Sequence, residues 1–424
     1  MSSAIVQDQP SLVETESVES DLSDVPLQSD LLREAKSVHV VRTVTFDEED
    51  TTCSSVDSGT TSTTTPSVEL DPSSQDEAFI RFKAVAATRI GEYMSSSSDD
   101  DDSLADFQQW SLDDFELVQK LGQGGVATVY EAQEKISGYH VALKAQKTED
   151  YLADGEIDIH ESLRHENIVK FYDYFYSDSF FGKMAVPKEK DSYALPGRRY
   201  VYTILELCRR GSLYDIITRQ PKGRLTDEAQ AAAWIKSAMV AIQHMHSLGI
   251  LHCDVKTANF VLSGSGLLKV TDFGFSQRQG EGVDKEVEGG SLLYMAPEHL
   301  IAWRDEQMTS DLQTGVDVYG LGAVLFELLV GELPYVILEE VEEGLSLEEA
   351  VEDLVSCWDD CEFKPHVTVL HSLNAETELP TPNFPEYISA EAQDLLRCLL
   401  HSSPRERISL EDALSHPWIE KFAA

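Results

Sequence analysis

The stretch LHCDVKTANFVL, residues 251–262, places four polar side chains of different chemistry at short, fixed spacings. Asp254 offers a carboxylate that can accept or orient the proton of an attacking hydroxyl group, and Lys256 offers an ammonium that can hold a phosphoryl group. Asn259 adds an amide oxygen, a hard ligand of the kind that Mg²⁺ prefers. His252 is expected to pack and hydrogen-bond without moving protons. The stretch therefore predicts a loop built for phosphoryl transfer.

A second oxygen ligand follows in VTDFGF, where Asp272 comes shortly after the first loop. Its carboxylate is suited to bridging Mg²⁺ and the phosphates of a nucleotide, and Gly274 permits the backbone to turn there. Together with Asn259, Asp272 completes the predicted metal site.

The stretch LGQGGVATV, residues 121–129, predicts a phosphate-binding turn between two strands. Glycines such as Gly122 and Gly124 let backbone N–H groups approach phosphate oxygens closely. The loop alone is weak evidence, because many hairpins carry two glycines. It lacks the GK[ST] ending of a Walker A loop, and no helix follows it directly, as a dinucleotide fingerprint requires.

A lysine and a glutamate further along the chain fit the same chemistry. Lys144, in VALK, can neutralise α- and β-phosphates if an anion orients its mobile ammonium. Glu156 lies on the next predicted helix and can supply that anion. Either residue alone is better explained as a charged surface residue that keeps the protein soluble. The ordered set of loop, lysine and glutamate instead predicts a Lys144–Glu156 ion pair.

The elements that must position these residues change in type along the chain. Strands dominate first: FELVQKLGQGGVATVYEA from Phe115 reads as a hairpin, and YHVALKAQ and YVYTILELC read as further strands. The helix predicted in GEIDIHESLRH carries Ile157, Ile159 and Leu163 on one face. Helices dominate later, as in TDEAQAAAWIKSAMVAIQHMHSLG, with a predicted threonine N-cap and a closing glycine. This order predicts an α+β fold of two lobes with a cleft between them.

The composition limits the partners. The 424 residues include 76 acidic against 33 basic side chains, a formal charge of −43. Such a charge disfavours nucleic acid and anionic membranes and favours basic partners. The six cysteines form no CxxC pair, which is typical of free thiols in a reducing compartment. With no apolar run of eighteen residues and no apolar leader, we expect a soluble intracellular protein of the cytoplasm, the nucleus or both.

Residues 1–110 are acidic and rich in Ser and Thr, and we expect them to be disordered. Within them, RTVTF (Arg42–Phe46) fits the docking motif recognised by type-1 protein phosphatase. The basic, apolar stretch FIRFKAVAATRIGEYM either docks on the acidic remainder or forms an isolated transient helix, and the second reading is favoured. Two insertions are predicted, a loop at about 177–199 and an acidic segment at about 336–380, interpreted as a solvated amphipathic helix rather than a docking site.

These motifs and their order resemble the eukaryotic protein kinase family from about Phe115 to Trp418. The resemblance implies a small strand-rich N-lobe (115–208), a helical C-lobe (209–418) and ATP with Mg²⁺ between them. It implies Asp254 as catalytic base, Lys256, Lys144 and Glu156 as its catalytic partners, and Mg²⁺ on Asn259 and Asp272. DVKTAN is similar to the serine/threonine form. The residues implied to contact ATP are Leu121, Gly122, Gln123, Gly124, Gly125, Val129, Ala142, Lys144, Glu206 and Cys208.

Further features of the family are matched elsewhere in the chain. Glu298 in YMAPE corresponds to the end of the activation segment, and Arg407 to its buried ion-pair partner. Asp317 corresponds to the residue that braces the catalytic loop. Two stretches, EIDIHESLRHENIVKF and ELCRRGSL, resemble the polo-like branch, although no polo-box-like region is expected after the kinase-like region.

Two departures from the family pattern carry predictions. Ala127 replaces the third glycine of the loop, which stiffens it slightly. Cys253 replaces an arginine that pairs with a phosphate on the activation loop, so activity is expected not to need phosphorylation through that contact. For Cys253 itself a buried, inert thiol is favoured over a redox role. Ser291 is expected to line the substrate site, and Ser212 and Ala258 lack the acids that read arginine in a substrate.

Two rival functions remain open from the sequence. A pseudokinase or scaffold would share the fold without phosphoryl transfer, but such proteins usually lack one of the residues Lys144, Asp254, Asn259 and Asp272. A binding hub would act through residues 1–110, with the rest of the chain incidental.

Overall fold

The structure of the chain is a computed structural model. Its described residues are 72–95, 110–124, 127–148, 152–180, 183–184, 199–280, 291–304, 313–338, 366–369, 373 and 377–423. Arg42–Phe46 lies outside them, as do Gly125 of the glycine-rich loop and residues 339–365 of the acidic insertion.

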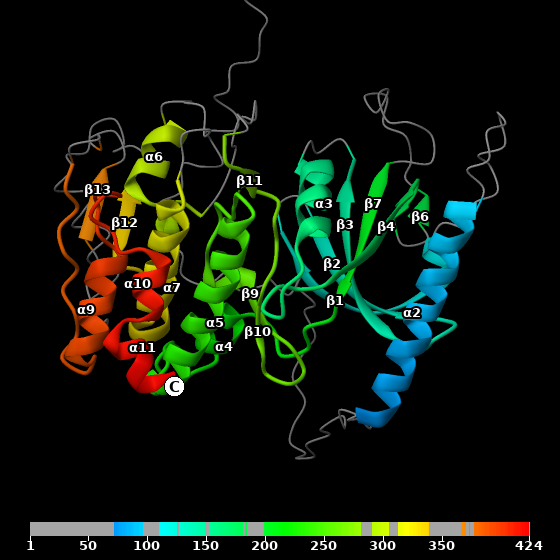
Figure 1. The fold of residues 1–424 in the computed structure, drawn as a ribbon, viewed down its shortest axis with the longest axis horizontal. Coiled ribbons are helices and arrows are strands. Elements are labelled where there is room, and N and C mark those ends of the chain that lie inside the picture. Colours follow the sequence, from blue (N-terminus) through cyan, green and yellow to red (C-terminus); the bar gives the residue numbers. More distant parts are fainter. Residues whose placement is uncertain are drawn as a thin grey trace, which may run out of the picture. The chain divides into compact units, whose positions relative to one another are not determined.

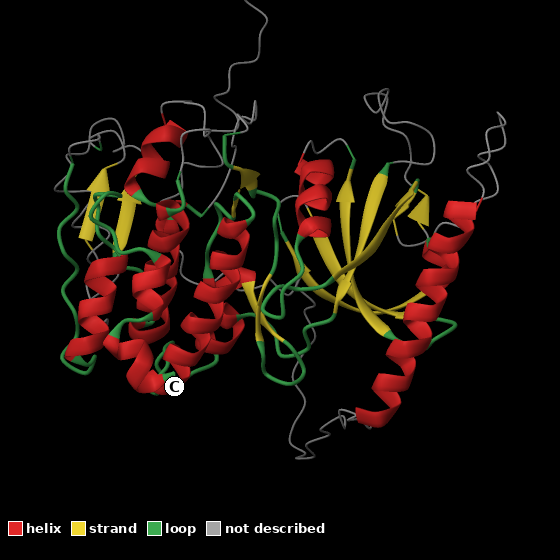
Figure 2. Cartoon of the chain, in the orientation of Figure 1, coloured by secondary structure: helices red, strands yellow, loops and turns green. Residues whose placement is uncertain are grey.

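An antiparallel sheet of five strands forms the first lobe (Figures 1 and 2), in the order β1-β2-β3-β7-β4. β1 and β2 are the predicted hairpin, with Gly122 opposite Val129. In β3 and β7, Lys144 lies opposite Thr203. The five strands are β1 (Phe115–Gln123), β2 (Ala127–Glu134), β3 (His140–Lys147), β4 (Phe171–Ser177) and β7 (Tyr200–Glu206).

The two faces of this sheet are covered by different helices, α3 (Leu152–Ser162) and α2 (Pro72–Ser95). Because side chains alternate along a strand, neighbouring residues of β3 face opposite ways. Ala142 packs with Ile157 of α3, and Leu143 belongs to a separate cluster with Phe82 of α2. Each face of the sheet therefore has its own apolar core.

The expectation that residues 1–110 are disordered is wrong for Pro72–Ser95, which form the helix α2. The reading of this stretch as an isolated transient helix is also wrong, since Phe82 is 1% exposed and packed against the sheet. A short apolar pattern gives no sign of its partners when these lie far away in the sequence.

The second lobe is helical and is organised around α5 and α7 (Figure 1). Val316–Val330 of α7 is buried throughout. A Cβ added at Gly320 of this helix would lie 2.7 Å from Cβ of Val255, so only glycine lets α7 lie this close to the catalytic loop. The helices are α4 (Leu213–Thr218), α5 (Glu228–Ser247), α6 (Pro297–Arg304), α7 (Gly315–Val330), α9 (Ala390–Leu399), α10 (Leu410–Leu414) and α11 (Pro417–Phe422).

Short strands hold the predicted catalytic residues in place. β9 (Phe260–Leu262) pairs with β10 (Leu268–Val270), and β8 (Ile250–Leu251) pairs with β11 (Gln277–Arg278). Residues 252–259 therefore span the gap between β8 and β9, and Asp272 lies two residues after the end of β10. The predicted two-lobed α+β fold is confirmed.

The start of α5 differs from the prediction, whereas its end agrees with it. The N-cap is Asp227, whose side chain accepts hydrogen bonds from the backbone N–H groups of Ala229 and Gln230, so the predicted threonine cap is wrong. Thr226 and Asp227 are adjacent, and both residue types are good N-caps, so the sequence alone did not show which of them caps the helix. At the other end Gly249 has φ +70°, a conformation that favours glycine.

Both predicted insertions contain strands. Ser179–Phe180 (β5) pairs with Lys183–Met184 (β6) in the first, where a loop was predicted. Tyr335–Leu338 (β12) runs parallel to His366–Val369 (β13) at the edges of the second. The predicted amphipathic helix is therefore wrong at residues 336–338 and 366–369. No helix among the described residues is both long enough and apolar enough to cross a membrane.

Candidate active site

Lys144 is the centre of a buried group of charges that joins three elements. Its Nζ lies 2.5 Å from Oε1 of Glu156 on α3 and 2.8 Å from Oδ1 of Asp272, after β10. Lys144 and Glu156 are 7% and 6% exposed. The predicted Lys144–Glu156 pair is present, and Asp272 joins it from the other lobe.

Gln146 also supports this group, and the sequence reading missed it. Its Nε2 donates to Oε2 of Glu156 over 3.0 Å, so both oxygens of that carboxylate are hydrogen-bonded. The two-residue spacing from Lys144 along β3 puts both side chains on one face of the strand. That spacing was the signal that could have identified Gln146.

The pKa values of this group follow from burial and charge. Burial lowers the pKa of the Lys144 ammonium, but the carboxylates of Asp272 and Glu156 outweigh it and hold the pKa above its ordinary value. The Lys144 ammonium lowers the pKa of Asp272 to about 2, against the opposing effect of burial. Lys144 is therefore a fixed cation and Asp272 a fixed anion at neutral pH.

Asp254 lies in the turn between β8 and β9, 4% exposed, and is held by its neighbours. Its Oδ2 accepts a hydrogen bond from Nδ2 of Asn259 over 3.0 Å and forms an ion pair with Nζ of Lys256 over 2.7 Å. The backbone N–H of Ser291 donates to the other oxygen over 3.4 Å. The structure thus brings Asp254, Lys256 and Asn259 together, as predicted.

Asp317 of α7 holds this turn in place through hydrogen bonds. Its two carboxylate oxygens accept the backbone N–H groups of His252 and Cys253, each over 2.8 Å, and Nε2 of His246 lies 2.8 Å from Oδ2. Burial raises the pKa of Asp317, but hydrogen bonding and charge from His246 and His252 lower it below its ordinary value. The bracing role expected for Asp317 fits these contacts.

His252 packs without an exposed nitrogen. It is 1% exposed, and its Nδ1 accepts the backbone N–H of Asp254 over 3.3 Å. Its ring lies 5.6 Å from that of Phe273, which also contacts His160 of α3 at 4.5 Å. Burial lowers the pKa of His160 to about 4, so this ring is neutral at physiological pH. These contacts lock the segment after Asp272 against both lobes.

Asn259 and Asp272 fit the demands of a Mg²⁺ ion. The Asn259 amide nitrogen donates to both the backbone oxygen and Oδ2 of Asp254, which leaves the amide oxygen for a ligand. Asp272 uses Oδ1 toward Lys144, and its side chain is 42% exposed. No group of three or more His, Cys, Asp or Glu side chains clusters as a metal site among the described residues. An ion on these two residues would draw its other ligands from phosphate and water.

The residues predicted to contact the nucleotide lie on the sheet and the chain that leaves it. Ala142 is buried in one apolar cluster, with Val129 and Cys208 packed against it. The backbone N–H of Gly124 donates to the carbonyl of Ala127 over 2.8 Å, which closes the turn of the β1–β2 hairpin. The predicted residues on these elements are Leu121, Gly122 and Gln123 in β1, Gly124 after it, Val129 in β2, Ala142 in β3, Glu206 at the end of β7 and Cys208 beyond it.

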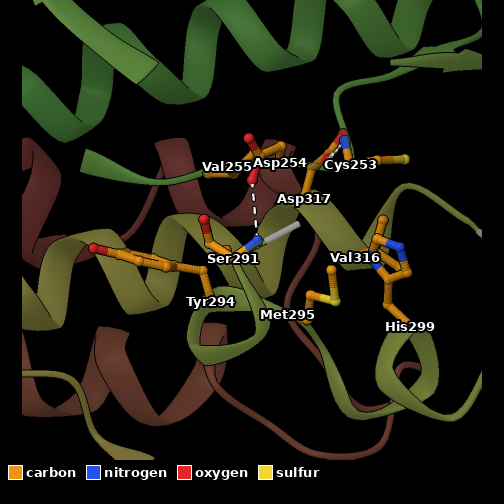
Figure 3. Close-up of a pocket in the computed structure, with 10 residues that line it drawn as sticks. Cys253, Asp254, Val255, Ser291, Tyr294, Met295, His299, Val316 and Asp317 are labelled. Atoms are coloured by element: carbon orange, nitrogen blue, oxygen red, sulfur yellow. Dashed lines mark hydrogen bonds between the residues drawn. The ribbon is translucent and has the colours of Figure 1, made fainter. Parts of the chain in front are cut away.

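A small cavity opens between Asp254 and the returning chain at Ser291 (Figure 3). It is also lined by Cys253, Tyr294 and Met295. Thr257 Oγ1 lies 3.1 Å from the hydroxyl of Tyr294, which donates to Oε2 of Glu327 over 2.5 Å. The position of Ser291 beside the Asp254 carboxylate supports its predicted place at the edge of the substrate site.

Cys253 is held in an unusual backbone conformation, with φ +61°, by the two hydrogen bonds that Asp317 accepts. Burial, and then the charges of Asp317 and Asp254, raise the pKa of its thiol well above the ordinary value. A thiol needs its thiolate form to react. The predicted inert thiol is therefore favoured over a redox role.

The predicted buried pair between Glu298 and Arg407 is confirmed. Nη1 and Nη2 of Arg407 lie 2.6 and 3.0 Å from the two oxygens of Glu298, and Arg407 also donates to the carbonyl of Gly315. Arg407 is 7% exposed. This bidentate geometry ties the start of α6 to the start of α7 and to the chain before α10.

We expect Arg407→Ala to lower the free energy of unfolding by about 3 kcal/mol, because Glu298 and three backbone carbonyls lose their partner. Arg405, which is exposed nearby, serves as the matched control, and Arg405→Ala should change stability little. Urea unfolding followed by circular dichroism measures both. Equal midpoints for the two variants would show that the pair contributes nothing.

Comparison with known proteins places this geometry in a family. A family model described as "Protein kinase domain" matches residues 115–419. An "Aurora kinase" of Patiria pectinifera is 30% identical over 320 residues, which cover 74% of this chain and 64% of that protein. The "Aurora kinase" of Dictyostelium discoideum is 28% identical, over 74% of this chain and 68% of its own. "Serine/threonine-protein kinase Aurora-1" of Arabidopsis thaliana is 27% identical, over 78% and 95%. The resemblance of two stretches to the polo-like branch stays a prediction.

Proposed function

Because the chain belongs to the protein kinase family, we propose that the residues around Lys144 and Asp254 carry its phosphoryl transfer from ATP to serine and threonine hydroxyls. The family and the Aurora relatives make it an ATP-dependent protein serine/threonine kinase. One observation carries the proposal: Nζ of Lys144 lies between Glu156 and Asp272, with Asp254 and Asn259 joined by hydrogen bonds nearby.

Asp254 is proposed to orient the acceptor hydroxyl and take its proton. One of its oxygens is engaged by Lys256 and Asn259, and the other faces the weaker contact from Ser291 at 3.4 Å, beside the cavity. An incoming hydroxyl can replace that contact. Lys256 then holds the transferring phosphoryl group, because its ammonium already lies beside the carboxylate that receives the proton.

Lys144 is proposed to bind the α- and β-phosphates. Glu156 and Gln146 fix the carboxylate side of the ion pair, so the ammonium is held in place before ATP arrives. Bound Mg²⁺, held by Asn259 and Asp272, would neutralise phosphate charge. The adenine is proposed to lie against Val129 and Ala142 and to meet the backbone groups of Glu206 to Cys208, as the family pattern implies.

Protein substrates follow from the family, and a preference for basic ones is proposed from the charge of −43. Ser212 is the N-cap of α4, with its hydroxyl bonded to Asp215, and Ala258 carries no charge. Docking of type-1 phosphatase at Arg42–Phe46 and an intracellular location stay predictions.

The acceptor class can be tested with one basic peptide made in three forms, with Ser, Thr or Tyr as its only hydroxyl. We expect the full chain to move label from γ-labelled ATP to the Ser and Thr peptides but not to the Tyr peptide, in the presence of Mg²⁺. Chelation of divalent cations should stop the transfer and added Mg²⁺ should restore it. Label on the tyrosine peptide, or transfer that survives chelation, would contradict the proposal.

A further inference from the structure

The helix α2 presents one apolar face to the first lobe. Phe79, Phe82, Val85 and Ala86 recur at helical spacing and pack against the sheet, and Phe82 is 1% exposed. Ile80, two residues before Phe82, is 66% exposed. The contrast within one turn shows that the packing selects a single face of the helix.

The surface that receives this face is aromatic and comes from three separate segments. The Phe82 ring lies 5.8 Å from Trp110, 5.2 Å from Tyr139 and 5.2 Å from Tyr172. The Phe79 ring lies 5.1 Å from Tyr139. Ring distances in this range, both stacked and edge-on, are favourable between aromatic side chains.

The polar ends of these aromatic residues are bonded to one another or to the sheet. Nε1 of Trp110 donates to Oδ2 of Asp173 in β4 over 2.9 Å, and the hydroxyl groups of Tyr139 and Tyr172 lie 3.3 Å apart. The rings are therefore held in fixed places and form a site for an aromatic helix face.

One edge of this site connects to the chain that is proposed to meet adenine. The ammonium of Lys170 lies 5.7 Å from the centre of the Phe79 ring. The backbone of Lys170 is bonded to Glu206 in both directions: its N–H donates to Oε2 of Glu206 over 3.2 Å, and its carbonyl accepts the N–H of Glu206 over 2.9 Å. Tyr172, under Phe82, is two residues further along.

Glu206 is held from the other lobe as well. Nζ of Lys269, on β10 and 3% exposed, lies 3.0 Å from Oε2 of Glu206 and donates to the carbonyl of Glu166 over 2.6 Å. Oε2 of Glu206 is thus shared between Lys170, which α2 contacts, and Lys269, three residues before Asp272. A displacement of Lys170 would therefore also displace Glu206, the residue that links the two lobes.

We propose that α2 is a docked positioning element of the nucleotide site, in which Phe79 and Phe82 hold Lys170 and Tyr172 and thereby fix Glu206 to Cys208. Undocking of α2 would loosen this segment and weaken ATP binding without removing any group that contacts the nucleotide. The effect on ATP rests on the proposed meeting of adenine with Glu206 to Cys208, whereas the bracing itself does not.

The test uses the full chain with Phe82→Ala, with Phe82→Leu as the conservative variant and Ile80→Ala as the exposed control on the same helix. Two readouts are taken: hydrogen exchange of the backbone amides at 200–208, and steady-state kinetics with ATP and peptide varied separately. We expect Phe82→Ala to speed exchange at 200–208 and to raise KM for ATP about five- to tenfold, with KM for the peptide little changed. Phe82→Leu should restore much of the loss, and Ile80→Ala should match the wild type.

Each outcome decides the inference. Unchanged exchange at 200–208 in folded Phe82→Ala would overturn the inference. So would a fall in kcat together with similar rises in KM for ATP and in KM for the peptide, because that pattern indicates a general loss of stability. Faster exchange with an unchanged KM for ATP would support the brace and contradict the placement of adenine. If Phe82→Ala does not fold, Phe79→Ala, at a half-buried position, is measured in its place and judged by the same two readouts.

Discussion

Asp254→Asn is expected to lower kcat about a thousandfold, because it removes the group that takes the proton from the acceptor hydroxyl. The amide has nearly the same size as the carboxylate, and its oxygen can still accept hydrogen bonds from Lys256 and Asn259, the partners that hold Oδ2 of Asp254. The fold and the nucleotide site should therefore survive. A thousandfold loss corresponds to about 4 kcal/mol of transition-state stabilisation.

The measurement is kcat for a serine peptide, together with Kd for ADP. Asp158→Asn is the matched control, since Asp158 is an exposed carboxylate on α3 that takes no part in the site. We expect the control to retain wild-type kcat and both variants to retain wild-type affinity for ADP. A kcat for Asp254→Asn close to that of the control would remove Asp254 from the chemistry.

The second large effect is expected for Lys144→Met, which should lower kcat/KM for ATP by about 10²- to 10³-fold. The ammonium bridges Glu156 and Asp272, at 2.5 and 2.8 Å, and is proposed to meet the phosphates. Its loss also leaves the buried carboxylate of Glu156 without its cation, so the free energy of unfolding should fall. Lys144→Arg should not restore activity, because a planar guanidinium cannot reproduce the position of the ammonium.

A double-mutant cycle separates the two roles of Lys144. Glu156→Gln removes the unpaired charge, so Lys144→Met with Glu156→Gln should recover part of the stability lost in Lys144→Met. Activity should stay low, since no cation returns to the phosphates. Urea unfolding and steady-state kinetics measure the two quantities on the same samples. Recovery of activity in the double variant would show that Lys144 acts only by neutralising Glu156.

The parts of the site that follow local rules were predictable from the sequence. Asp254, Lys256 and Asn259 lie within one short turn, where spacing alone brings them together, and both Lys256 and Asn259 contact the Asp254 carboxylate. The pairing of Lys144 with Glu156 could also be inferred, because the lysine lies on a strand and the glutamate lies on the helix that follows this strand, so both can face the same cleft. Arg407 and Glu298 required the family resemblance, since their spacing carries no local signal.

The missed parts depend on segments that meet only in the fold. Phe82 meets Trp110, Tyr139 and Tyr172, and nothing in the pattern around Phe82 specifies those partners. The strand at Tyr335–Leu338 was missed because its pairing partner begins at His366, beyond a long acidic stretch. Tertiary packing thus overrode the weak local preference for disorder in one case and for helix in the other.

We propose that this protein kinase assembles its site without the phosphate contact that an arginine at the position of Cys253 would make. Lys144 is already paired with Glu156, the turn at Cys253 is fixed by Asp317, and Cys253 is neutral. The most direct test is the initial rate of label transfer from γ-labelled ATP to a serine peptide by the phosphatase-treated full chain with Mg²⁺. We expect the same rate as for the untreated chain, and a rate far above that of Asp254→Asn. A treated chain that binds ATP but transfers no label would contradict it.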